Sequence, residues 1–178
     1  AMSPGEREAL VEQYARGPVR IREALARVPH EALQWRPFPG KWSVHEVVVH
    51  CADSETNAAL RIRYLLAEPE PLIVGYDQDA WARRFDYHAQ PLEASLAVAA
   101  AARDRTVPLL RAMPDADWSK QGRHTEHLGD LQRLEAADLL HVTPGVSPAS
   151  RSSAARSLRR ALCRMPRAPE ACRLPSSA

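Results

Sequence analysis

Residues 42–55 read Trp-Ser-Val-His-Glu-Val-Val-Val-His-Cys-Ala-Asp-Ser-Glu, and this stretch contains the clearest helix start in the chain. Ser43 and Glu46 have the spacing of a capping box, in which each side chain accepts a hydrogen bond from the other residue's backbone amide. The pattern continues without a helix-breaking residue until Pro69. It therefore predicts a long helix over residues 44–67.

Three further segments have the apolar spacing of long helices. Residues 6–28 form one apolar stripe, which Gly17-Pro18 should bend. An alanine-rich helix should open at Pro91, and Pro108 should kink or divide it because proline lacks a backbone donor. A last periodic segment covers residues 131–141. No stretch alternates with period two over enough residues to predict a strand, so the pattern indicates an all-α, four-helix bundle.

Proline-rich loops over residues 29–41 and 68–77 flank the predicted helix 44–67, and residues 77–85 could form a short helix. Aromatic residues gather beside these loops: Trp35, Phe38, Trp42, Tyr76, Trp81, Phe85 and Tyr87. Such residues commonly clamp loops onto a helical core. The alternative is that they line an apolar substrate pocket at one end of the bundle.

The composition is that of one globular domain. The 178 residues are 45% hydrophobic and 26% charged. No apolar run approaches the roughly 20 residues that span a bilayer, and no secretory signal is visible, so we expect a cytoplasmic protein. The three cysteines lack CxxC spacing, which argues against a disulfide framework or a zinc knuckle, and Cys51 should be a small core residue.

The charge is distributed unevenly along the chain. Residues 142–178 contain seven arginines and one acidic residue, a net charge of +6, whereas the whole chain carries +2. We therefore expect a mildly acidic helical domain over residues 3–145 and a basic, low-complexity tail over residues 146–178. The tail contains no Phe, Trp or Tyr. It should be disordered or form a short basic helix.

Histidine is the only abundant metal-ligating residue type that is suitably placed. The seven histidines are His30, His45, His50, His88, His124, His127 and His141. His50 lies in the middle of a predicted helix and should face the bundle interior or its edge, and His141 follows an apolar stretch. We expect His45 to be exposed, and the loop histidines His124 and His127 to be solvated. Each of these residues taken alone more often packs in a core or faces solvent than binds a metal. No phosphate-binding loop, dinucleotide fingerprint, nucleophile elbow or HExxH motif occurs.

Residues 39–55 resemble the signature of the DinB/YfiT-like family, and so do the segments 61–81 and 131–141 and the region around Trp118. The resemblance covers about residues 6–141. It implies a four-helix bundle, often dimeric, that holds a divalent zinc or nickel ion through three histidines. Members are described as metal-dependent hydrolases or as thiol S-transferases that act with low-molecular-weight thiols.

By position the resemblance makes His50 the first metal ligand and His141 the second. The third family position falls on Gly145, which offers no side chain. Three functional hypotheses follow. The chain is a metal-dependent enzyme that acts on a small molecule, with an external group completing the coordination. Alternatively it is a non-catalytic bundle that has lost its third ligand. The last alternative is that the protein binds an anionic partner, nucleic acid or membrane, through its arginine-rich tail. The acidic body and the lack of tail aromatics disfavour it.

Overall fold

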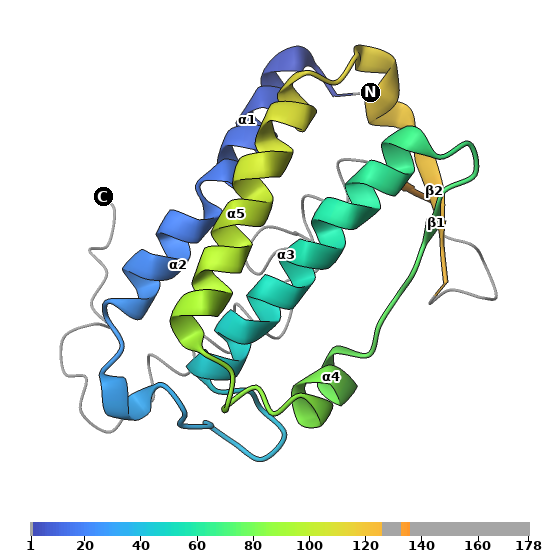
Figure 1. Cartoon of the computed structure of the whole chain (residues 1–178). Helices are drawn as coiled ribbons and strands as arrows, with labels where there is room; N and C mark the ends of the chain where they lie inside the picture. Colours follow the sequence, from blue (N-terminus) through green and yellow to red (C-terminus); the bar gives the residue numbers. More distant parts are fainter. Residues whose placement is uncertain (1, 126–132, 136–178) are drawn as a thin grey trace, which may run out of the picture.

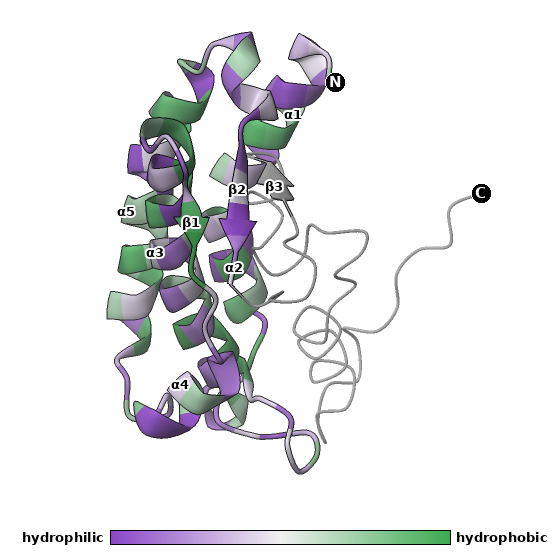
Figure 2. Ribbon diagram, turned by 90° about the vertical axis from the view of Figure 1, so that its right-hand side faces the viewer, coloured by the Kyte–Doolittle hydropathy of each residue, from purple (hydrophilic) through white to green (hydrophobic). Residues whose placement is uncertain are grey.

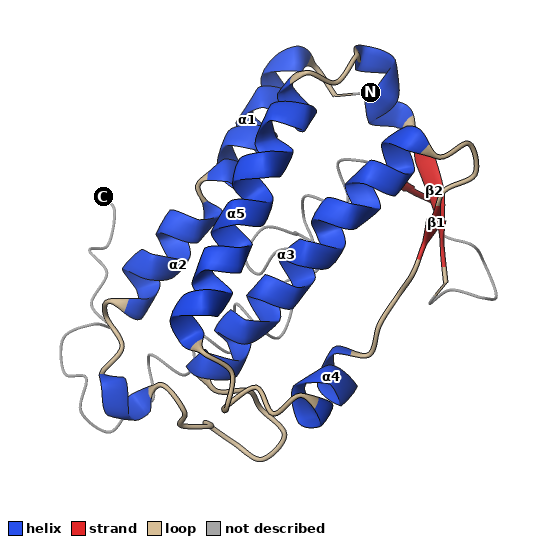
Figure 3. Ribbon diagram, viewed as in Figure 1, coloured by secondary structure: helices blue, strands red, loops and turns tan. Residues whose placement is uncertain are grey.

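The structure, a computed structural model, describes residues 2–125 and 133–135, the latter by their backbone. Five α-helices, two short 3₁₀ helices and three short strands lie within these residues. In chain order they are α1 (Pro4–Ala15), α2 (Gly17–Leu25), η1 (His30–Ala32), α3 (Val44–Ala67), β1 (Leu72–Ile73), α4 (Gln78–Arg84), α5 (Leu92–Arg111), η2 (Asp115–Ser119), β2 (Gln121–His124) and β3 (Arg133–Glu135). The chain is mostly helical, as predicted (Figure 3).

Helix α3 begins and ends where the capping box and the following prolines predicted. The Glu46 amide donates to the Ser43 hydroxyl at 3.2 Å, and the Ser43 amide donates to the Glu46 carboxylate at 2.8 Å. A second capping box, formed by Ser3 and Glu6, begins α1. The sequence analysis did not single it out. Both boxes satisfy amides that the first helical turn would otherwise leave without a partner.

Helices α1 and α2 lie end to end beside α5, with a break at Arg16 that confirms the predicted bend (Figure 1). Pro18 stands in the first turn of α2, where a missing backbone donor does no harm. Gly17 has a separate role. A Cβ atom at this position would lie 1.5 Å from Nη1 of Arg103, so the absence of a side chain makes room for that guanidinium.

Helix α5 packs against α3 on one side and against α1 and α2 on the other. Apolar and polar residues follow one another in short blocks along α3 and α5, as amphipathic helices require (Figure 2). The largest apolar cluster fills the space between α1, α3, α5 and η2, and it contains Leu10, Val11, Tyr14, Ile62, Leu65, Val107, Leu110 and Trp118. Pro108 does not divide α5. The helix continues to Arg111 because Val107 and Leu110 anchor its last turn in this cluster.

A buried ionic cluster crosses the same core. Arg103 donates from Nε to the Glu55 carboxylate at 2.7 Å and from Nη1 to the backbone carbonyl of Tyr14 at 2.6 Å. The Tyr14 hydroxyl donates to the other Glu55 oxygen. Burial and the neighbouring Glu55 charge raise the pKa of Tyr14, so this hydroxyl keeps its proton. The cluster ties α1, α3 and α5 together at one level of the bundle.

Three short strands form a small sheet beside the end of α3 (Figure 1). β1 pairs in parallel with β2, with Ile73 opposite His124, and β2 pairs antiparallel with β3, with Gly122 opposite Leu134. None of these strands was predicted from the sequence. The helix predicted over residues 131–141 is wrong at residues 133–135, which form β3. Strands of two to four residues are too short to produce a recognisable alternation.

The rest of the predicted last segment, with His141 and Gly145, and the arginine-rich residues 146–178 lie outside the described residues. The domain division at residue 145 stays a prediction. Within the described part of the chain, no helix is both long and apolar enough to cross a membrane.

Candidate metal centre

His50 lies inside the molecule, one of the two alternatives that were predicted, and its residue surface is 7% exposed; the residue stands in the second turn of α3. The Trp42 ring packs edge-on against the imidazole, with 4.8 Å between ring centroids. Trp42 comes from the loop before α3, and the capping box fixes how that loop enters the helix. The capped start of α3 therefore sets the positions of both rings.

The Nδ1 atom of His50 is buried and has no hydrogen-bond partner within the described part of the chain. A buried polar atom without a partner costs about 1–3 kcal/mol, so native proteins rarely leave one unused. Burial lowers the pKa of His50, and the negative charges of Asp53 and Asp79 only partly oppose this effect. The imidazole is therefore neutral near pH 7, which is the form that binds metal ions.

Residues 74–87, which include α4, are fastened along the polar stripe of α3 on which His50 lies. Three side-chain contacts hold this segment in place: Arg61 donates to the Val74 carbonyl at 2.5 Å, Tyr76 hydrogen-bonds Ser54, and Tyr87 donates to Asp53 at 2.5 Å. Each partner on α3 comes from a position three to eleven residues after His50. The same face of α3 therefore carries the histidine and the anchors of the covering segment.

Aromatic side chains from both flanking loops meet beside His50. Trp42, Trp81 and Tyr87 pack with Val49 and Ala82 in a second buried cluster. The arrangement agrees with the expectation that aromatic residues clamp loops onto the helical core. The Trp42 ring of this cluster packs against the imidazole and contributes to the burial that lowers the pKa of His50.

Cys51, the residue after His50, is buried and not in a disulfide, as predicted. Burial raises the pKa of its thiol to about 12. The thiolate is the form that binds metals and attacks electrophiles, so Cys51 is an apolar packing residue at neutral pH.

Among residues 2–125, no group of three or more His, Cys, Asp and Glu side chains is close enough to hold a metal ion. The described part of the chain thus provides His50 but not a complete ligand set. The second predicted ligand, His141, and the loop histidine His127 lie outside the described residues. Whether the chain brings His50 and His141 together therefore stays a prediction.

Two other histidines differ from expectation. His45 is buried rather than exposed, and its Nε2 atom lies 2.9 Å from the Gln90 carbonyl. A carbonyl only accepts, so this nitrogen carries a proton and donates. His124 is buried in β2 rather than solvated, because the alternation of that strand turns its side chain inward.

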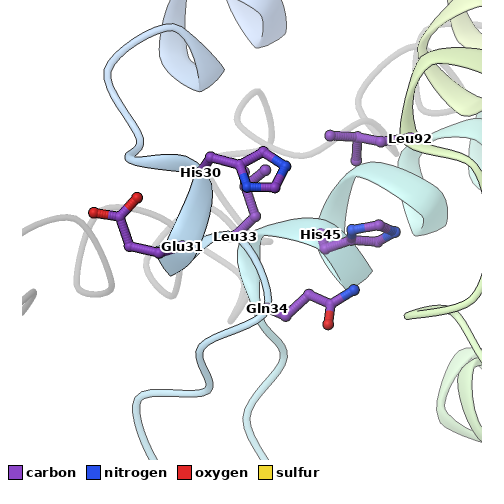
Figure 4. Close-up of a pocket in the computed structure, with 6 residues that line it drawn as sticks. All are labelled: His30, Glu31, Leu33, Gln34, His45 and Leu92. Carbon is purple, nitrogen blue, oxygen red and sulfur yellow. The ribbon is translucent and has the colours of Figure 1, made fainter.

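A separate cavity of about 390 Å³ lies near the start of α3 (Figure 4). Its lining consists of His30, Glu31, Leu33, Gln34, His45 and Leu92. His45 and His50 are five positions apart on one helix, so their side chains leave α3 in directions about 140° apart. The cavity and the His50 cluster are therefore different places in the fold.

Asp53 was not predicted as part of this site. Its hydrogen bond from Tyr87 and its charge on His50 place it there. The spacing between His50 and Asp53 could have indicated it, since residues three apart on a helix share a face. The contact with Tyr87, 34 residues further along the chain, could not be derived from helical spacing.

The fold and the buried, unpartnered histidine define a helical-bundle protein with one candidate metal ligand in its described core. Comparison with known proteins agrees, and the chain belongs to the DinB superfamily, whose model matches residues 13–143. A relative from Oceanobacillus iheyensis, named "Putative metal-dependent hydrolase", is 32% identical over 109 residues, covering 61% of this chain and 63% of the relative. The match thus spans less than two thirds of that relative's length.

A relative from Bacillus subtilis, named "Putative metal-dependent hydrolase YfiT", is 28% identical over 142 residues, which cover 80% of this chain and 79% of the relative. A solved YfiT structure from the same organism superposes with a TM-score of 0.78 at 22% identity, covering 92% of this chain and 90% of that one. It is described as an unusual four-helix bundle. The predicted fold class is therefore confirmed. The names of the relatives imply a metal ion without saying which one.

Proposed function

We propose that this protein is a metal-dependent hydrolase that holds a divalent zinc or nickel ion through His50 and His141. The unpartnered, buried Nδ1 of His50 is the observation that carries the proposal. A histidine that served only packing would pair this nitrogen inside the core, as His45 pairs its Nε2 with Gln90. The names of the relatives support the same reaction class.

The residues around His50 fit a metal ion in two ways. First, the imidazole stays neutral because burial lowers its pKa, so no proton competes with the metal near pH 7. Second, Asp53 and Asp79 place negative charge near the imidazole, which attracts a cation. When bound, such an ion would supply Lewis acidity and lower the pKa of a water molecule or thiol.

The surrounding residues contribute packing and orientation. Trp42 covers one edge of the His50 ring and keeps solvent from that side. Tyr87 and Trp81 pack in one cluster with Val49 and hold α4 and its flanking loops against α3. We propose a small molecule as the substrate, with water or a low-molecular-weight thiol as the second reactant.

Metal content tests this proposal directly. We expect the purified full-length chain to contain stoichiometric zinc or nickel by elemental analysis, and both His50→Ala and His141→Ala to lose it. His30→Ala is the matched control, because His30 is exposed and distant in the chain from the candidate site. Wild-type protein that binds neither ion, or a His50→Ala variant that keeps full metal content, would refute the proposal.

The choice between water and thiol as the second reactant is a separate measurement on the metal-loaded protein. Hydrolysis of p-nitrophenyl acetate that depends on His50 supports a hydrolase. Transfer of cysteine to chlorodinitrobenzene with the same dependence, and without ester hydrolysis, would instead assign thiol S-transfer.

A further inference from the structure

Asp53 lies on the face of α3 that carries His50 and anchors the covering residues 74–87 through Tyr87. It follows His50 by three residues, so their side chains leave the same face of the helix about one turn apart. In helical bundles, a carboxylate and a histidine three positions apart on one helix recur as a metal-binding pair in the order Glu-x-x-His, and His50 and Asp53 have the same spacing in the reverse order.

Tyr87 fixes the orientation of the Asp53 carboxylate. Its hydroxyl donates to Oδ2 of Asp53 at 2.5 Å, and the residue itself is 1% exposed. A phenol is protonated at neutral pH, so the Tyr87 hydroxyl is a donor and the Asp53 carboxylate accepts. The other carboxylate oxygen, Oδ1, takes part in none of the hydrogen bonds or ion pairs within residues 2–125.

The four side chains form one cluster because Trp42 contacts two of them. Its ring lies 4.8 Å from His50 and 6.2 Å from Tyr87, centroid to centroid, both in edge-on geometry. Tyr87 in turn reaches Asp53. Nδ1 of His50 is thus a buried atom without a partner in the described part of the chain, and Oδ1 of the half-buried Asp53 is the second potential ligand atom on the same face of α3.

We propose that Asp53 is a metal ligand, binding through Oδ1 the same divalent cation as His50, and that Tyr87 is the positioning residue for its carboxylate. This inference rests on the proposed function. Carboxylate ligands in metalloproteins are themselves hydrogen-bonded by neighbouring groups, and the Tyr87 hydroxyl supplies that bond. A nitrogen and oxygen ligand set suits zinc and nickel.

Asp79 offers a matched comparison. It is also a carboxylate whose charge acts on His50, but it is exposed at the start of α4. Its side chain has no buried donor to orient it among the described hydrogen bonds. If nearby negative charge alone raised the affinity for the metal ion, Asp79 and Asp53 would raise it by similar amounts. If Asp53 coordinates the ion, removing Asp53 lowers the affinity much more than removing Asp79.

The test is a zinc titration of the full chain against a chromogenic chelator, with cobalt absorption as an independent report on ligand type. We expect Asp53→Ala and Asp53→Asn to weaken zinc affinity by at least about 10–100-fold, and Tyr87→Phe by about 10-fold. Asp79→Asn should change the affinity by less than about threefold. The cobalt spectrum of Asp53→Asn should shift from that of the wild type.

Each outcome either supports or refutes Asp53 as a metal ligand. Asp53→Asn keeps the shape of the side chain and can still accept from Tyr87, so it serves if Asp53→Ala does not fold. If both Asp53 variants bind zinc within about twofold of the wild type while His50→Ala does not bind, Asp53 is not a ligand and the metal centre itself stands. If the wild type binds no metal, the proposed function fails, and this inference fails with it.

Discussion

Gly17 shows how one missing side chain can hold a core arrangement in place. The guanidinium of Arg103 occupies the space where a Cβ atom would be, 1.5 Å from Nη1. Arg103 cannot move away freely, since it also binds Glu55 and the Tyr14 carbonyl. A methyl group at position 17 must therefore break buried hydrogen bonds.

We predict that Gly17→Ala lowers the free energy of unfolding by about 1–3 kcal/mol, the usual effect of overpacking a core. Gly5→Ala is the control, because Gly5 lies in α1 and no atom stands within 4 Å of its Cβ position. This second change should leave stability unchanged or raise it slightly. Chemical denaturation of both variants measures the difference in unfolding free energy. Equal effects would show that the space beside Gly17 is not needed by Arg103.

Glu46 is the residue whose titration should be visible in the stability of the fold. Burial acts to raise its pKa, but hydrogen bonds from Arg36 and the Ser43 amide outweigh this and hold the pKa below its usual value. A carboxyl group with a lower pKa in the folded state stabilises the protein above its unfolded pKa. That contribution is lost as the pH falls through the folded pKa.

Glu46→Gln should therefore be less stable than the wild type by about 1–2 kcal/mol at pH 7, and the difference should narrow as the pH falls from about 4.3, the pKa of an unfolded glutamate, through the lower folded pKa. Glu6→Gln, in the exposed capping box of α1, is the control and should show a smaller loss. Urea unfolding between pH 3 and pH 7 provides the data. A difference that stays constant over this range would show that the charge of Glu46 is not responsible.

At the scale of the elements, Glu55 and Arg103 couple helices that are far apart in the sequence. Both side chains are almost wholly buried, with 1% and 5% of their surface exposed. Removing one partner of a buried ion pair leaves an uncompensated charge, whereas replacing both by apolar groups of similar size is often tolerated.

We predict that Glu55→Leu and Arg103→Leu each cost about 3–5 kcal/mol of unfolding free energy, and that the double variant costs much less than their sum. A double-mutant cycle from guanidinium unfolding measures the coupling. Strict additivity would mean that the two side chains do not interact in solution.

The long helices could be predicted from the sequence, whereas the short strands and the contacts between residues distant in the sequence could not. The bounds of α3 and the break between α1 and α2 follow from a capping box, prolines and apolar spacing, which are local signals. Strands β1, β2 and β3 exist because distant segments pair, and two to four residues carry no readable period. Burial of His50 followed from its helix position, but its unpartnered nitrogen and the Tyr87–Asp53 contact depend on tertiary packing.

For the whole molecule, the central claim is that the folded bundle binds a divalent cation at His50. A ligand that binds only the folded state must raise its stability. Because the site is assembled from α3 and segments distant in sequence, the unfolded chain should bind the ion poorly. The melting temperature thus reports on the intact site rather than on a local peptide.

The most direct measurement is thermal unfolding of the full chain with and without zinc or nickel, for wild type and His50→Ala. At 100 times the dissociation constant we predict a gain of about 2.7 kcal/mol, or roughly 5–10 °C in Tm, for the wild type and no gain for the variant. An unchanged wild-type Tm, or an equal rise in both proteins, would contradict the account.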